Sequence, residues 1–227
     1  MGEFEKYLFA EFSKAVINLR HSPYALGLEI YCVDDDLRQP AVRLITNTYE
    51  HAKAHSPENR KRRRGDADSA LEALWNNSYW HWRTEVTVGN EHISFEGDYR
   101  DTEGIVLRKK WIQSLGLWYE DNFEELNFDK ALEIGGKIIE YFDELCLKLA
   151  KNLHPVIVAS LKAELPIIFF NRESPDHESM GLTFLANPSN LLIEYARFIR
   201  VYCGDEWGDF MERNVNKDEL TYSSLYK

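Results

Sequence analysis

Cysteine is scarce in this chain of 227 residues, and the few cysteines lie far apart. There are 3 of them, Cys32, Cys146 and Cys203, and no Cys-x-x-Cys pair occurs. An odd number of widely spaced cysteines is not the pattern of a disulfide framework, and it offers no paired thiolates to a metal ion. We therefore expect buried, reduced thiols.

Long apolar runs are also missing. No stretch approaches the ~20 apolar residues that a membrane span needs. The chain begins Met1-Gly2-Glu3-Phe4-Glu5-Lys6, without the basic flank and apolar run of a secretory signal. The expected location is the cytoplasm, away from any membrane.

Local signatures of catalysis and cofactor binding are absent as well. The sequence has no Gly-x-Gly-x-x-Gly, no Gly-x-x-x-x-Gly-Lys-Ser/Thr and no Gly-x-Ser-x-Gly. His51 and His55 have the spacing of one helix face but lack the glutamate of a His-Glu-x-x-His motif, and we interpret them as a solvated polar face. Asp34-Asp35-Asp36 lacks the spacing of a calcium loop and is interpreted as a plain turn. We predict no cofactor, no metal site and no catalytic residue that a motif identifies; a triad assembled from distant residues would leave no local trace.

Positive charge is in short supply. There are 38 acidic and 27 basic residues, giving a formal net charge of -11. Since affinity for nucleic acid comes largely from Lys and Arg displacing counterions, general nucleic-acid binding is disfavoured, and a basic protein is the better partner. The exception is the run Arg60-Lys61-Arg62-Arg63-Arg64, which we interpret as an exposed loop near residues 57–66, with a phosphate contact or a nuclear address as the alternative.

Apolar material for a large core is plentiful, with 44% hydrophobic and 13% aromatic residues. We expect a single α+β domain over residues 1–227, built from an antiparallel or mixed sheet with flanking amphipathic helices, and a partly irregular tail from residue 204. Helical and strand patterns are interleaved without a regular strand-helix-strand rhythm or a repeat, which favours the antiparallel or mixed sheet.

Periodicity predicts the elements of the first half. Residues 3–20 have the spacing of an amphipathic helix, and the alternation over 24–32 is typical of a half-buried strand. A second strand over 41–45 would complete an antiparallel hairpin. Three further predictions are a short helix over 47–56, a helix through Ala70 to Trp75 capped by Asp66 or Asp68, and strands over 84–88 and 92–95 that pair around Gly89-Asn90.

The second half is predicted to be mainly helical. We expect helices over 106–115, over 127–149 with Asn127 as the cap, and over 155–165. A short apolar run at 166–170 predicts a buried strand, and 171–179 a polar loop. The last predicted helix begins with Asn187 as N-cap and Pro188 in its first turn.

Aromatic residues gather in two places. Trp75, Trp80 and Trp82 form the first group, which we interpret as core packing rather than as a platform for bases or sugars. The second is residues 119–129, here called the acidic segment, where five carboxylates alternate with aromatic rings. Carboxylates steer a basic partner while rings supply affinity, so this segment is the candidate partner-binding site; the alternative is a helix entrance with inward-facing rings. The candidate residues are Tyr119, Glu120, Asp121, Phe123, Glu124, Glu125 and Asp129.

Several short stretches resemble a bacterial family known as domain of unknown function 4303. The resemblance lies in Tyr24 to Tyr31 leading into Asp34-Asp35-Asp36, in Trp80 and Trp82, in Ile167 to Phe170, and in Asn187-Pro188. It implies a bacterial, cytoplasmic α+β protein whose relatives look like components of toxin and immunity gene neighbourhoods, and it carries over no catalytic residue.

Three functional hypotheses follow. The first is a non-catalytic binding protein, such as an immunity protein that binds a basic toxin through an acidic surface. The second is an enzyme whose site assembles from scattered groups such as His81, His154 and the acidic turns. The third is a structural or regulatory homo-oligomer.

Overall fold

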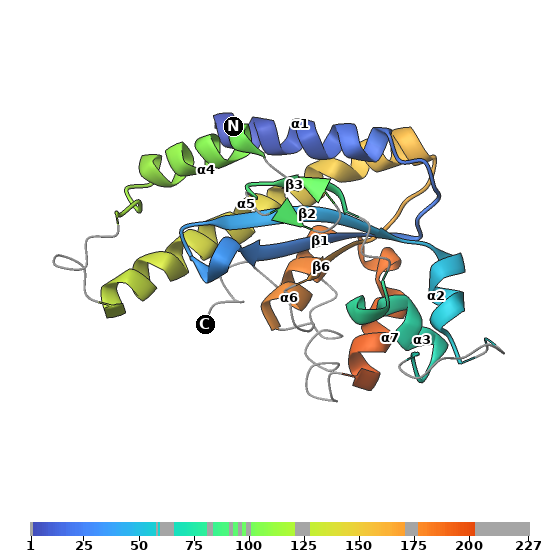
Figure 1. The fold of residues 1–227 in the computed structure, drawn as a ribbon. Helices are drawn as coiled ribbons and strands as arrows, with labels where there is room; N and C mark the ends of the chain where they lie inside the picture. Colours follow the sequence, from blue (N-terminus) through green and yellow to red (C-terminus); the bar gives the residue numbers. More distant parts are fainter. Residues whose placement is uncertain are drawn as a thin grey trace.

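A computed structural model describes residues 2–57, 59, 66–80, 84–90, 93–94, 97–98, 101–120, 128–170 and 177–202 (Figure 1). The elements follow in chain order: α1 (Glu3–Ile17), β1 (Ala25–Cys32), η1 (Val33–Asp35), β2 (Pro40–Asn47), α2 (Tyr49–His55), α3 (Ala70–Trp75), η2 (Asn77–Tyr79), β3 (Thr84–Val88), β4 (Ile93–Ser94), β5 (Gly97–Asp98), α4 (Thr102–Ser114), α5 (Phe128–Leu161), β6 (Ile167–Phe170), α6 (His177–Ala186), η3 (Ser189–Leu191) and α7 (Ile193–Tyr202). The basic run at 60–64, Asn127, residues 171–176 of the predicted polar loop and the predicted tail from residue 204 lie outside the described residues.

The central sheet is mixed, in the order β3-β2-β1-β6, and this confirms the predicted α+β class. β1 and β2 form the expected antiparallel hairpin, with Leu28 opposite Leu44, while β6 lies parallel to β1. The predicted pairing of 84–88 with 92–95 is wrong. β3 pairs with β2 instead, where its apolar residues extend the core, and β4 pairs with β5.

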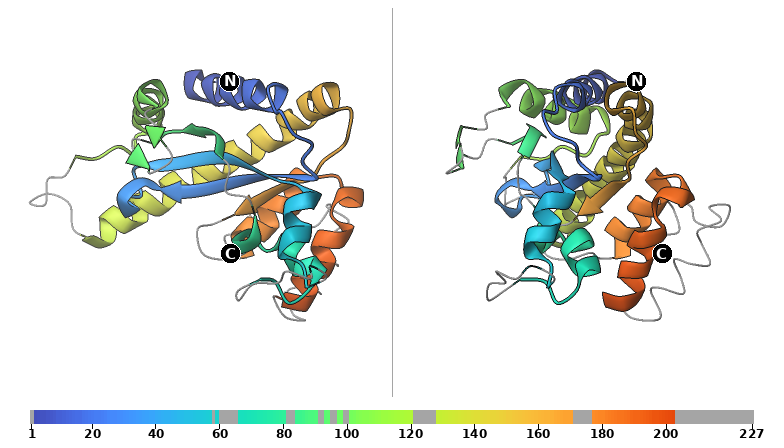
Figure 2. Two further views of the ribbon diagram at one scale, coloured as in Figure 1. Left: turned by 45° about the vertical axis from the view of Figure 1, so that its right-hand side comes forward. Right: turned by 90° about the vertical axis from the view of Figure 1, so that its right-hand side faces the viewer.

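β1 is buried on both faces at its start, which corrects the prediction of a half-buried strand. Figure 2 shows α1, α4 and α5 on one side of the sheet and the smaller helices α2, α3, α6 and α7 on the other. Gly27 leaves room for its neighbours on the second side, since a Cβ there would lie 2.5 Å from Ile45 Cγ1 and 2.7 Å from Phe170 Cε2. Glu29 is buried on that side as well, where it pairs with Arg43.

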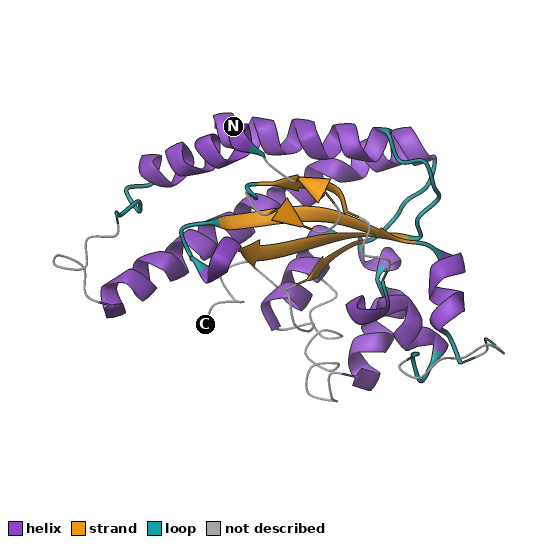
Figure 3. Cartoon of the chain, viewed as in Figure 1, coloured by secondary structure: helices purple, strands orange, loops and turns teal. Residues whose placement is uncertain are grey.

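The longest helix replaces two predicted ones (Figure 3). α5 continues through Pro155 for 34 residues, although an interior proline costs a helix about 3 kcal/mol or more. Leu153 and Ile157 are fully buried on either side of the proline, so core packing offsets the lost hydrogen bond. α6 corrects the prediction of a polar loop over 171–179, because the helix already begins at His177.

Two predicted helix caps are wrong. Ser69, rather than Asp66 or Asp68, caps α3 by accepting a 3.0 Å hydrogen bond from the backbone N–H of Glu72. Asp66 lies 3.0 Å from His55 Nδ1 instead. Asn187 caps no helix.

Asn187 instead joins the outer edge of β6 to α6. Its Nδ2 donates to the carbonyls of Ile167 and Thr183, both at 2.7 Å, and its Oδ1 accepts from Ile167 N–H at 2.7 Å. Thr183 Oγ1 accepts from Phe169 N–H at 2.9 Å. These bonds satisfy buried backbone groups that an edge strand would otherwise leave unpaired.

Two of the three clustered tryptophans belong to the core, as predicted. Trp75 and Trp80 are buried, and the Trp80 ring meets Phe170 at 4.9 Å between centroids. Trp80 Nε1 donates to the Leu74 carbonyl at 2.8 Å, so the polar end of the ring is satisfied. Trp82 lies outside the described residues.

Candidate interaction site at the β1–β2 turn

The turn between β1 and β2 is the centre of a polar network that includes the start of the acidic segment. Asp34 and Asp35 have φ values of 53° and 59°, the left-handed region that aspartate tolerates better than most residues. Asp36 then accepts hydrogen bonds from Arg38 Nε at 2.9 Å, Arg38 Nη2 at 2.8 Å and Gln39 Nε2 at 3.1 Å. Partial burial opposes ionisation of Asp36, but these hydrogen bonds outweigh it and hold the pKa of the carboxyl below its usual value.

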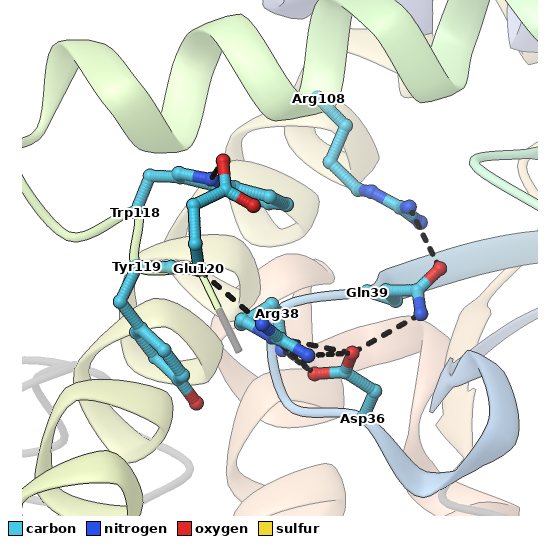
Figure 4. A network of polar contacts seen from close by, with 7 residues as sticks. All are labelled: Asp36, Arg38, Gln39, Arg108, Trp118, Tyr119 and Glu120. Carbon is cyan, nitrogen blue, oxygen red and sulfur yellow. Dashed lines mark hydrogen bonds and ion pairs between the residues drawn. The ribbon is translucent and has the colours of Figure 1, made fainter. Parts of the chain in front are cut away.

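Arg38 connects this turn to the beginning of the acidic segment. Its guanidinium carbon lies 4.8 Å from the ring centroid of Tyr119 and 6.0 Å from that of Trp118 (Figure 4). Nη1 also donates to the Tyr119 carbonyl at 3.3 Å. A cation held between aromatic rings and a carboxylate fixes the backbone of the segment against the turn.

Glu120 makes polar contacts within the protein even though its side chain is 74% exposed. Trp118 Nε1 donates to Glu120 Oε1 at 2.8 Å, and Lys109 Nζ lies 3.6 Å from the same oxygen. Lys109 Nζ also lies 4.3 Å from the Trp118 ring centroid. The hydrogen bond from Trp118 and the charge of Lys109 lower the pKa of Glu120, so the carboxylate is ionised at neutral pH.

Arg108 fixes α4 to the same end of the sheet. This arginine is buried, and its Nη1 donates to the carbonyls of Gly89 at 2.5 Å and Pro40 at 3.2 Å. Its Nη2 lies 3.5 Å from Gln39 Oε1, which links it to the turn. Gly89 has a φ of 85°, and a Cβ there would lie 3.1 Å from the Pro40 carbonyl, so glycine suits this position. Sequence reasoning missed Arg108; its spacing of four residues from Gly104 and from Ile112, both buried, was the available signal.

The helix that follows the acidic segment contacts the same turn. α5 begins at Phe128, and its Gly135 packs against Leu37 of the turn. A Cβ on Gly135 would lie 2.5 Å from Leu37 Cδ1 and 2.7 Å from Leu37 Cβ, so the contact depends on glycine. Trp118, Tyr119 and, at Gly135, the helix α5 therefore all contact the β1–β2 turn.

Three of the seven predicted site residues are described. Tyr119 and Glu120 belong to the network around Arg38, and Asp129 is exposed in the first turn of α5, a position typical of a helix entrance. Asp121, Phe123, Glu124 and Glu125 lie outside the described residues.

Of the groups named for a distributed active site, those that the structure describes are not brought together. His154 Nε2 lies 3.1 Å from the Ala186 carbonyl, where α5 meets α6. On α5, His154 lies 19 residues after Gly135, the residue that contacts Leu37 beside the acidic turn. At the rise of an α-helix this separation is about 28 Å. His81 lies outside the described residues. Among those that are described, no three His, Cys, Asp or Glu side chains are grouped as metal ligands would be.

The two described cysteines are free thiols in different surroundings. Cys146 on α5 is buried, as predicted, whereas Cys32 at the end of β1 is only partly buried. Burial, with help from the charge of Asp143, raises the pKa of the Cys32 thiol to about 11. A thiol with a raised pKa holds little thiolate at neutral pH and is a poor nucleophile.

No family model, no curated protein and no solved structure matches this chain. The similarity to domain of unknown function 4303 therefore stays a prediction from the residues named above. None of the helices that the structure describes combines the length and the apolar character that crossing a membrane requires.

Proposed function

We propose that the protein is a non-catalytic binding protein, of the immunity type, that recognises a basic protein such as a toxin through the acidic segment. The observation that carries the proposal is that one turn contacts the chain on both sides of this segment, Arg38 at Tyr119 and Leu37 at Gly135, six residues beyond Asp129. A recognition segment with fixed ends loses less conformational entropy when it binds.

Charge supports the same conclusion. The formal net charge is -11, and residues 119–129 contain five carboxylates but no lysine or arginine. Such a field accelerates encounter with a basic partner and disfavours anionic ones. The proposed location is the cytoplasm, and the proposed family is the one that the sequence resembles, with its toxin and immunity neighbourhoods.

A capture experiment tests this function. The full-length protein is immobilised, exposed to lysate of the organism that encodes it, and washed at low salt; bound proteins are identified by mass spectrometry. We expect a basic protein that the Glu124→Lys/Glu125→Lys variant fails to retain, because two charge reversals turn attraction into repulsion.

The control variant is Glu50→Lys/Glu194→Lys, which makes the same change of net charge at exposed positions on α2 and α7. It should retain the partner. Capture of no basic protein, or equal loss in both variants, would refute recognition through the acidic segment.

A further inference from the structure

An exposed apolar pair begins at the C-terminal end of the acidic segment and continues into α5. Phe128 and Leu132, in the first turns of α5, are 75% and 47% exposed. They are four residues apart and therefore lie on one face of the helix. The next position on that face is Gly136, where a Cβ would meet no atom within 4 Å, so the helix surface beyond Leu132 is open.

Charged side chains surround this pair. Asp129 and Glu133 lie on the exposed side of the same turns, and Glu133 Oε1 pairs with Lys137 Nζ at 2.6 Å. The carboxylate-rich part of the acidic segment precedes the pair in the sequence. An apolar centre with a charged rim is the composition of a protein interface, in which the centre supplies most of the affinity.

We propose that Phe128 and Leu132 are the apolar contact of the interface with the basic partner. The inference rests on the proposed function and deepens it, because it adds a source of affinity to the charges that steer encounter. The occupant is a protein surface that presents an apolar side chain between lysines and arginines. The carboxylates of the acidic segment complement those cations, and the α5 pair receives the apolar side chain.

Binding of the captured basic protein, purified and measured by calorimetry, tests the inference. Phe128→Ala/Leu132→Ala should raise Kd by about tenfold or more, the loss expected when central apolar contacts are truncated. The matched control is Ile193→Ala/Val158→Ala, which removes side chains that are 71% and 44% exposed elsewhere. It should change Kd by less than about twofold, as expected of residues outside the interface.

The outcomes separate the inference from the function on which it rests. If the Phe128/Leu132 variant binds like the native protein while Glu124→Lys/Glu125→Lys binds weakly, the apolar contact is refuted and the proposed function stands. If the native protein captures no basic protein, both fall. Alanine is a good helix former, so the variants should keep their fold, and unchanged circular dichroism and melting temperature verify this.

Discussion

Adjacent glycines in α5 should respond to the same substitution in opposite directions. Gly135→Ala and Gly136→Ala both replace glycine in a helix interior, which favours the folded state by about 1 kcal/mol. They differ in what the new methyl group meets. At Gly136 it enters open space, whereas at Gly135 it would overlap Leu37, with 2.5 Å to Cδ1 and 2.7 Å to Cβ.

The magnitudes follow from these contacts. Gly136→Ala should raise the free energy of unfolding by about 1 kcal/mol, equivalent to about 2–4 °C in melting temperature for a chain of this size. Overpacking a well-packed contact costs about 1–3 kcal/mol, so Gly135→Ala should be neutral to about 2 kcal/mol less stable than the native protein. The two variants should therefore differ by about 1–3 kcal/mol.

Urea unfolding followed by circular dichroism measures both values, and equal m-values show that the unfolded state is unchanged. Leu37→Ala provides the control, because it removes Leu37 Cγ and Cδ1 but keeps the Cβ at 2.7 Å, so it should relieve the closest overlap and restore part of the helix gain at Gly135. Equal stabilisation by Gly135→Ala and Gly136→Ala would show that the turn does not rest firmly on α5. Only the contacts of Arg38 would then hold the acidic segment at the turn.

Three further predictions concern single side chains. Asn187→Ala should lower the free energy of unfolding by about 3 kcal/mol in urea titrations, because it leaves the buried backbone of Ile167 unpaired; Thr183→Ser, which keeps the hydroxyl, should change it little. Asp36→Asn should lower the free energy of unfolding by about 1–2 kcal/mol at pH 7. Because the pKa of Asp36 is lowered in the folded state, this difference from the native protein should be full above pH 3.8 and shrink as the pH falls below it. A difference that does not depend on pH would contradict this. Cys32 should react with iodoacetamide at pH 8 about a hundredfold more slowly than in the unfolded chain, by mass spectrometry, because its pKa rises from 9.0 to about 11; equal rates would refute the buried position.

Local patterns predicted most of the elements but few of their partners. The amphipathic helix at residues 3–20, the hairpin and the buried strand near 167–170 follow from periodicity, because each element buries its own apolar face. The parallel pairing of β6 with β1 joins segments about 140 residues apart, and no local pattern specifies it. The same limit applies to β3, whose partner is β2 rather than the next strand in sequence.

Signals that act only locally were misleading where tertiary contacts compete with them. Asn187-Pro188 has the pattern of a helix start, yet the Asn187 side chain satisfies the edge of β6, a strand 20 residues earlier. Pro155 has the pattern of a helix boundary, yet burial on both sides carries α5 through it. In both cases the free energy of burying or hydrogen-bonding core groups exceeds the local preference of these residues for a helix boundary.

The carboxylates of the acidic segment have different roles in the folded protein. Glu120 counts toward the acidity of the segment in the sequence, but Lys109 and Trp118 satisfy it within the chain, and Arg38 adds a second positive charge close by. These cations reduce the negative potential at this end, so Glu120 and Tyr119 serve to hold the segment rather than to attract a partner. The attraction that we propose must then come from Asp121, Glu124, Glu125 and Asp129, which follow Glu120 in the sequence on both sides of Phe128. Steering charge and apolar contact thus occupy the same short stretch of chain, immediately after the point where it is fixed to the β1–β2 turn.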